Sequence, residues 1–328
     1  MSFREIKGQD RPISILQKYI KQSRLTGSYL FTGGEGVGKR LTAKTLAKAL
    51  NCEKQETDSC DACASCRKIE KGQHPDIHII GSTQDGDSDA IKIEYIRRMQ
   101  RDISLKPYEG KKKVFIIDDA HNLTPDAANA MLKILEGPPA GSSVILVSAK
   151  PALLFKTIIS RCKIVKFYPM QRIKLEEVLK SDFHLDDVLA HYLAYSCEGR
   201  IGRALNLKDA DILREKNRVI DLFTLAKRQG GLNPAVETRN SVRVALNILG
   251  GWFRDMYLIK IGVPYGELIN LDRKEELLRS MHRYAFTDLY EIMNSISSSI
   301  FYLERNANIK LLLSNLREGI SYGARRTG

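Results

Sequence analysis

The first half of the chain alternates short apolar runs with longer segments in which apolar residues recur every three or four positions. The short runs are typical of strands that are buried on both faces, and the longer segments are typical of helices with one apolar face. This alternation predicts an α/β domain in which helices cover both sides of a parallel sheet. The predicted strands span residues 29–32, 77–80, 114–117, 144–148 and 164–167.

The pattern changes after Pro169, where the strand-like runs end and helical periodicity takes over. Apolar residues then recur at the spacing of a helix face, for example at Val242, Leu246, Leu249 and Phe253. The last part of the chain is therefore expected to be helical and to pack against neighbours, with a monomeric helical cap as the alternative. We expect three domains: an α/β domain over 1–168, a small helical domain over 169–208 and an all-helical domain over 209–328.

A glycine-rich turn lies between the first predicted strand and the helix that follows it. It contains Gly33, Gly36, Gly38 and Lys39 in the motif G-x-x-x-x-G-K. The backbone N–H groups of such a turn surround an anion, and the lysine reaches the outer phosphates. A Ser or Thr that holds magnesium should come next, but this chain has Arg40. The motif therefore predicts a nucleotide-type fold that has lost part of its hydrolytic equipment.

Two carboxylates, Asp118 and Asp119, follow the predicted strand 114–117. A phosphate-loop protein holds magnesium at such a place, because the carboxyl ends of parallel strands face the ligand. Acidic residues also end strands simply because they favour turns. The interpretation as an acidic partner of the loop therefore depends on the phosphate loop that precedes it.

Four cysteines lie close together in the sequence with the spacing C-x7-C-x2-C-x2-C: Cys52, Cys60, Cys63 and Cys66. Four thiolates suit tetrahedral zinc and leave no open position for chemistry, which predicts a structural zinc module over 51–67. A disulfide framework and a redox or iron–sulfur site are the alternatives. Cys162 and Cys197 stand apart and are predicted to be buried thiols.

Net charge and hydropathy give only weak evidence on the partner and the location of the protein. The chain has 52 Lys and Arg against 39 Asp and Glu, so its formal net charge is +13. This excess favours a polyanionic partner such as nucleic acid, but a generally basic solvated surface explains it equally well. There is no apolar run of membrane-spanning length and no signal peptide, so we expect a cytoplasmic protein.

Taken together, these motifs resemble the clamp-loader subunits of bacterial DNA polymerase III, within the AAA+ superfamily. The resemblance covers the first half of the chain, and the second half matches only in layout. The matching stretches are 33–39, the four cysteines, 118–121, the run AANAMLKILEGPP at 127–139, and Ser160-Arg161-Cys162. The last two stretches are far more specific to this family than a phosphate loop alone.

The resemblance implies an AAA+ nucleotide-binding-type domain with an embedded zinc module, a lid and a collar. In this family the arginine that corresponds to Arg161 points into the ATP site of the adjacent subunit. Arg40 removes the magnesium-binding hydroxyl, and Asp119 replaces the glutamate that positions water. A retained trans arginine beside a degraded site is the pattern of the delta-prime branch of the family. This pattern implies a ring member, or stator, with little or no ATPase of its own.

The family also implies the partners. They are the delta subunit and three gamma or tau motor copies, together with the sliding beta clamp, which the assembly sets on primer–template DNA. As part of the holoenzyme, such a subunit is grouped with DNA-directed DNA polymerase without carrying the polymerase site.

Some interpretations stay open at this stage. Structural zinc is predicted, ATP or ADP binding is undecided, and Arg40 argues against magnesium binding. Gly202 and Arg203 are weaker candidates for a lid contact to nucleotide. One rival function is an active gamma- or tau-type ATPase in which Thr42 or a water holds magnesium, and another is a zinc-containing DNA-binding protein without a motor partner.

Overall fold

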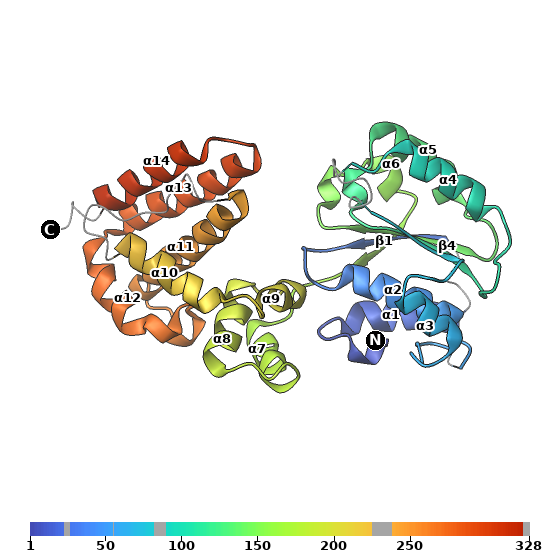
Figure 1. Cartoon of the computed structure of the whole chain (residues 1–328), viewed down its shortest axis with the longest axis horizontal. Coiled ribbons are helices and arrows are strands. Elements are labelled where there is room, and N and C mark those ends of the chain that lie inside the picture. Colours follow the sequence, from blue (N-terminus) through green and yellow to red (C-terminus); the bar gives the residue numbers. More distant parts are fainter. Residues whose placement is uncertain (23–26, 55, 82–89, 225–237, 324–328) are drawn as a thin grey trace. The chain divides into compact units, whose positions relative to one another are not determined.

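The computed structural model describes residues 1–22, 27–54, 56–81, 90–224 and 238–323. The chain divides into two compact units (Figure 1). The first contains Met1–Met170 and Arg200–Arg203, and the second contains Gln171–Gly199 and Ala204–Gly328. Each unit is described by itself below. The finer division into three domains stays a prediction.

The first unit is built on a parallel five-stranded sheet with the order β2-β3-β4-β1-β5. All five predicted strands are confirmed, and the three in the middle of the sheet have almost completely buried side chains. This burial explains why they read as continuous apolar runs rather than as alternating ones. The strands are β1 (Gly27–Thr32), β2 (Ile77–Ile80), β3 (Lys113–Ile117), β4 (Ser142–Ser148) and β5 (Lys163–Lys166).

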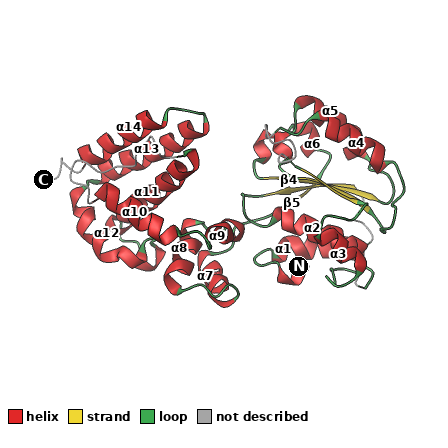
Figure 2. Ribbon diagram, in the orientation of Figure 1, coloured by secondary structure: helices red, strands yellow, loops and turns green. Residues whose placement is uncertain are grey.

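Helices cover both faces of this sheet, as Figure 2 shows. On one face, Leu16 and Leu46 pack in a cluster with Phe31 of β1. On the other face, Met131 packs in a second cluster that contains Leu146 of β4. The first face is covered by α1 (Asp10–Lys21), α2 (Lys39–Asn51) and α3 (Ala64–Glu70), and the second by α4 (Ile93–Ile103), α5 (Pro125–Glu136) and α6 (Lys156–Ile159).

The start of α5 follows from local chemistry. The Thr124 side chain accepts a hydrogen bond from the Ala127 N–H at 3.3 Å, and Pro125 takes the first helical position, where a missing N–H costs nothing. The helix ends at Glu136, before Gly137 and two prolines. These boundaries make Glu136 the last residue of α5.

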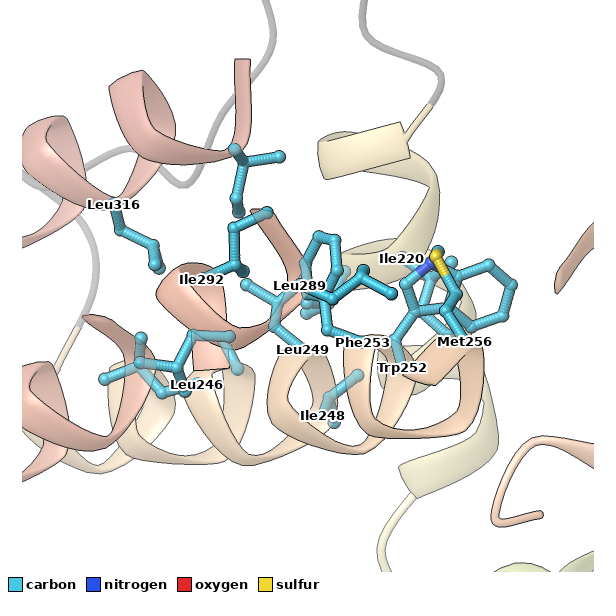
Figure 3. Packing of buried hydrophobic residues seen from close by; sticks show 14 of the residues in the cluster. Ile220, Leu246, Ile248, Leu249, Trp252, Phe253, Met256, Leu289, Ile292 and Leu316 are labelled. Atoms are coloured by element: carbon cyan, nitrogen blue, oxygen red, sulfur yellow. The ribbon is translucent and has the colours of Figure 1, made fainter. Parts of the chain in front are cut away.

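Every regular element among the described residues of the second unit is helical. Its core is formed mainly by α11, α13 and α14, where Leu249 and Trp252 pack against Leu289 and neighbouring residues (Figure 3). The predicted helix face at Val242, Leu246, Leu249 and Phe253 is buried, which confirms the periodicity. The helices are α7 (Arg172–Ser181), α8 (Asp187–Ser196), α9 (Ile201–Leu207), whose first residues belong to the first unit, α10 (Ile212–Thr224), α11 (Arg239–Lys260), α12 (Lys274–Ser280), α13 (Phe286–Glu304) and α14 (Ile309–Gly323).

Over the described part of the chain, none of the helices combines the length and the apolar character that crossing a bilayer requires. The fold class predicted from the sequence, a parallel α/β unit followed by helices, is therefore confirmed.

Candidate nucleotide and metal sites

The predicted phosphate loop has the expected strand–turn–helix context. It leaves β1 at Thr32 and enters α2 at Lys39, and Gly38 precedes the first helical residue. Gly36 and Gly38 have φ values of +76° and +94°, a left-handed conformation that side chains other than glycine rarely adopt. The turn therefore has both the position and the backbone freedom that phosphate binding requires.

Close packing explains why two positions of the loop are glycine. A Cβ at Gly33 would lie 2.4 Å from the Phe167 carbonyl oxygen, and a Cβ at Gly36 would lie 2.9 Å from the Arg203 backbone nitrogen. The Gly202 N–H also donates to the Gly36 carbonyl at 2.8 Å. Gly202 and Arg203, which the sequence marked as weaker candidates, therefore lie against the loop through their backbone.

Lys39 is buried inside the loop, with 6% of its surface exposed. Its Nζ donates to the Gly33 carbonyl at 2.7 Å and to the Gly34 carbonyl at 2.6 Å. Burial lowers the pKa of Lys39, and the nearby carboxylates of Asp119, Asp118 and Glu35 oppose that shift. The loop's own carbonyls thus hold the ammonium group at the place from which a phosphate-binding lysine acts.

Arg40 points toward the acidic end of β3. Its Nη1 lies 3.2 Å from Oδ2 of Asp118, and the arginine side chain is 64% exposed while the aspartate is 14% exposed. Burial and the charge of Asp119 raise the pKa of Asp118, while the guanidinium of Arg40 and the ammonium of Lys39 lower it. The carboxylate that a magnesium ion would need is therefore already paired with a cation of this chain.

Two further residues bear on the magnesium question. The Thr42 hydroxyl donates to the Gly38 carbonyl at 2.9 Å and is fully buried, so it is turned to the helix backbone. Asp119 adopts a left-handed conformation with φ of +48° and accepts no hydrogen bond from the loop among the described residues. Neither arrangement supplies the ligand that Arg40 removes.

Arg161 follows α6 and lies at the surface of the first unit, with 32% of its side chain exposed. Its Nε and Nη2 donate to Oε1 of Glu136 at 2.8 and 2.6 Å, and its Nη1 donates to the Thr157 carbonyl at 3.0 Å. These described hydrogen bonds involve no residue of the phosphate loop. The guanidinium is therefore held in a fixed, partly exposed position by the last residue of α5.

The four predicted cysteines come together in space. Their sulfur atoms lie within 4.8 Å of one another, and three of them, Cys52, Cys63 and Cys66, are buried. None of the six cysteines forms a disulfide, so the structure does not support the disulfide alternative. The cluster could hold a metal ion, which confirms that the sequence spacing brings the four thiols to one point.

Backbone N–H groups around the cluster favour thiolate. The Cys60 sulfur accepts from the Cys63 N–H at 3.3 Å, and the Cys63 sulfur accepts from the Cys66 N–H at 3.4 Å. Burial opposes ionisation of Cys60, but the N–H donors of Ala62 and Cys63 and the thiols of Cys52 and Cys63 outweigh it and lower the pKa of this thiol to about 6. Burial raises the pKa of Cys66 in the same cluster. Thiolates are what a metal ion binds, so the donor set fits a metal of the zinc type.

Of the two remaining cysteines, Cys197 is buried as predicted, with 1% of its surface exposed. Cys162 is only half-buried, although desolvation still raises its pKa to about 12.

Sequence reasoning missed the lysines that hold this module. Lys48 is 1% exposed and donates to Asp61 at 2.6 Å and to Glu70 at 2.8 Å. The Lys111 ammonium donates to the Cys52 carbonyl at 2.5 Å. Lys48 lies one helical turn before Cys52, and that spacing was the one available signal, because residues four apart share a helix face.

Known proteins similar to this chain identify its family. Residues 8–171, half of the 328 residues, match the family described as "DNA polymerase III, delta subunit". The DNA polymerase III subunit delta' of Bacillus subtilis is 29% identical over 329 residues, which cover 94% of each chain. The DNA polymerase III subunit tau of Escherichia coli is 33% identical over 220 residues, which cover 64% of this chain and 33% of tau.

A solved structure of a DNA polymerase III gamma-subunit-related protein from Thermotoga maritima covers 96% of this chain, with 17% identity and a TM-score of 0.48. The family match and the near full-length similarity to a delta' subunit agree with the motifs described above. The chain therefore belongs to the DNA polymerase III delta subunit family of clamp-loader proteins.

Proposed function

We propose that this chain is a delta-prime-type subunit of a DNA polymerase III clamp loader and acts as a stator that hydrolyses little or no ATP itself. The extent of similarity supports this assignment, because the delta' relative is covered over 94% of its length while tau is covered over 33%. The observation that carries the proposal is the ion pair between Arg40 and Asp118, which occupies both magnesium-binding positions of the phosphate loop.

Phosphoryl transfer from ATP needs magnesium, which phosphate-loop proteins bind with the hydroxyl after the lysine and an aspartate on the neighbouring strand. Here the hydroxyl position carries a guanidinium, and the aspartate is paired with that guanidinium. Gly33, Gly36, Gly38 and Lys39 would still hold the phosphates of ATP or ADP. The chain's own site is therefore a place for binding rather than for turnover.

Arg161 is the residue proposed to act in catalysis, on the nucleotide of a neighbouring motor subunit. An arginine supplied in trans stabilises the charge of the transition state and increases the rate by about 10³–10⁵-fold. Its partner Glu136 is 58% exposed, so the pair lies at a surface where a phosphate can replace the carboxylate. Because Glu136 binds both Nε and Nη2 through one oxygen, it also orients the guanidinium before the neighbour arrives.

The partners follow from the same assignment. The proposed assembly contains gamma or tau motor subunits and a delta subunit, and it sets the sliding beta clamp on primer–template DNA. The four-cysteine site is proposed to hold structural zinc over 51–67, and the helices of residues 209–328 are proposed to form the collar through which subunits pack, after a lid over 169–208. In this arrangement the chain contributes its position in the ring and one arginine.

An Arg161→Ala variant tests the proposal in a complex reconstituted with the chain's own motor and delta subunits. We expect the complex to assemble normally and its DNA-stimulated ATPase to fall by about one third if three motor sites turn over independently, and by more if they are coupled. Arg98→Ala is the matched control, because Arg98 is an exposed arginine of α4, outside the proposed collar. Unchanged turnover with Arg161→Ala in an intact complex would contradict the proposal.

A further inference from the structure

Arg40 places a positive charge of this chain at the point where phosphate-loop proteins bind magnesium. The Arg40–Asp118 ion pair engages Nη1 of the arginine, which leaves Nε and Nη2 for other acceptors. The side chain is 64% exposed, so its guanidinium can turn toward a ligand without leaving a buried position. Arginine suits this task because its planar guanidinium binds phosphate oxygens through two parallel hydrogen bonds.

Lys39 is placed to contribute to the same phosphate site as Arg40. A lysine ammonium has three N–H donors, and the described residues accept two of them, at the Gly33 and Gly34 carbonyls. Lys39 is buried, with 6% of its surface exposed, so its ammonium stays within the loop. Its remaining N–H is available to a phosphate oxygen bound by the same loop.

We infer that the loop binds a nucleoside diphosphate or triphosphate without a divalent cation, with Arg40 in the electrostatic role of the metal. A magnesium ion would join the aspartate of the neighbouring strand to the phosphates, and Arg40 already contacts that aspartate with donors left for the phosphates. This inference deepens the proposed function and rests on it only in using the same degraded site. It adds that the nucleotide binds without magnesium and that Arg40 takes the place of the metal.

The charge around the loop agrees with this assignment. Lys39 and Arg40 open α2, whose N-terminus adds the positive end of the helix dipole. Asp118 and Asp119 oppose them, so a magnesium ion would enter a place where a guanidinium already neutralises one carboxylate. Magnesium would have to compete with Arg40 for Asp118, whereas a polyphosphate meets complementary charge from Lys39 and Arg40.

The test is the affinity of the isolated full-length chain for fluorescent N-methylanthraniloyl-ADP, measured with excess MgCl₂ and with excess EDTA. We expect the dissociation constant of the native chain to differ by less than about 2-fold between the two conditions. In Arg40→Thr, which restores a hydroxyl and releases Asp118, we expect affinity in EDTA to fall by about 10-fold or more and magnesium to recover it. Lys39→Ala should abolish binding in both conditions.

Arg98→Thr is the matched control. Arg98 is an exposed arginine of α4, on the opposite side of the sheet from the helix that the loop opens (Figure 1), and this variant should bind as the native chain does. Thermal melting of each variant shows whether it is folded, and Arg40→Lys serves as a second variant that keeps the charge and should stay metal-independent, with weaker binding.

Three results would overturn the inference: native binding that magnesium strengthens by about 10-fold, no nucleotide binding in either condition, or Arg40→Thr binding unchanged in EDTA. The first of these results would also weaken the case against ATP hydrolysis by this chain, whereas the role of Arg161 is decided separately, by assembly and by the Arg161→Ala turnover of the complex. A failure of the stator role with metal-independent binding intact would leave this inference standing.

Discussion

Replacing Lys48 by methionine should destabilise the cysteine module. Lys48 is the buried cation that joins α2 to Asp61 in the cysteine loop and to Glu70 in α3. Burial lowers the pKa of Lys48, but its hydrogen bonds with Asp61 and Glu70 outweigh burial and raise it overall. The ion pairs therefore stabilise the folded module as long as Lys48 is charged.

The magnitude follows from burial. Removing one partner of a buried ion pair costs about 3–5 kcal/mol, because a charge stays behind without compensation. Here the carboxylates that remain are 31% exposed at Asp61 and 52% exposed at Glu70, so water can solvate both. Methionine keeps an unbranched stem in place of the lysine stem, so little cavity opens. We expect a loss of about 2–3 kcal/mol in the free energy of unfolding the module.

Urea unfolding of the metal-loaded full-length chain, followed by metal release to a chromogenic chelator, measures this loss. Lys44→Met is the matched control, because Lys44 pairs with the same Glu70 at 2.8 Å from a more exposed position, 24% against 1% for Lys48. An exposed pair of this kind contributes about 0.5 kcal/mol. If Lys48→Met shifted the release midpoint no further than Lys44→Met does, burial would not be the source of the stabilisation and the reasoning would be refuted.

Three further outcomes can be checked. Cys63→Ser should reduce bound metal in the purified chain from about one equivalent to well below it, and metal analysis that finds full occupancy would exclude a four-thiolate site. The hydrogen bonds of Lys44 and Lys48 lower the pKa of Glu70 from 4.5 to about 2, so this carboxylate stabilises the fold above pH 4.5 and the benefit is lost as the pH falls toward 2. Acid titration of module unfolding should show that loss, at most about 1 kcal/mol because Glu70 is half exposed, and Lys48→Met should diminish it. Glu136→Ala should leave Arg161 mobile and lower the ATPase of the assembled complex by less than Arg161→Ala does, and an equal or larger loss would mean that Glu136 does more than orient the arginine.

The elements of the fold could be predicted because their signals are local. Fully buried parallel strands such as β3 and β4 leave continuous apolar runs, and α5 begins at a threonine cap followed by proline. The spacing of the four cysteines also predicted that they cluster in space. A short loop can bring Cys60, Cys63 and Cys66 together, and Cys52 directly follows the preceding helix. The final helical region was predicted correctly from periodicity alone.

The pairs that define the candidate sites were not predictable, because they join residues that are distant in sequence. Arg40 contacts Asp118 only because the carboxyl ends of β1 and β3 lie at the same edge of the parallel sheet. Arg161 contacts Glu136 only because α5 and α6 pack together. The burial of Lys48 ran against the expectation that a lysine is exposed. The contact between Gly36 and Gly202 needed the fold itself.

The central claim is that this chain supplies an arginine to a neighbour while its own loop lacks a functional magnesium site. The most direct test is steady-state ATP hydrolysis by the purified chain alone in the presence of magnesium. The account predicts no turnover above the level without protein. Brisk magnesium-dependent hydrolysis that Lys39→Ala abolishes would contradict it, because the pair formed by Arg40 and Asp118 would then not prevent catalysis.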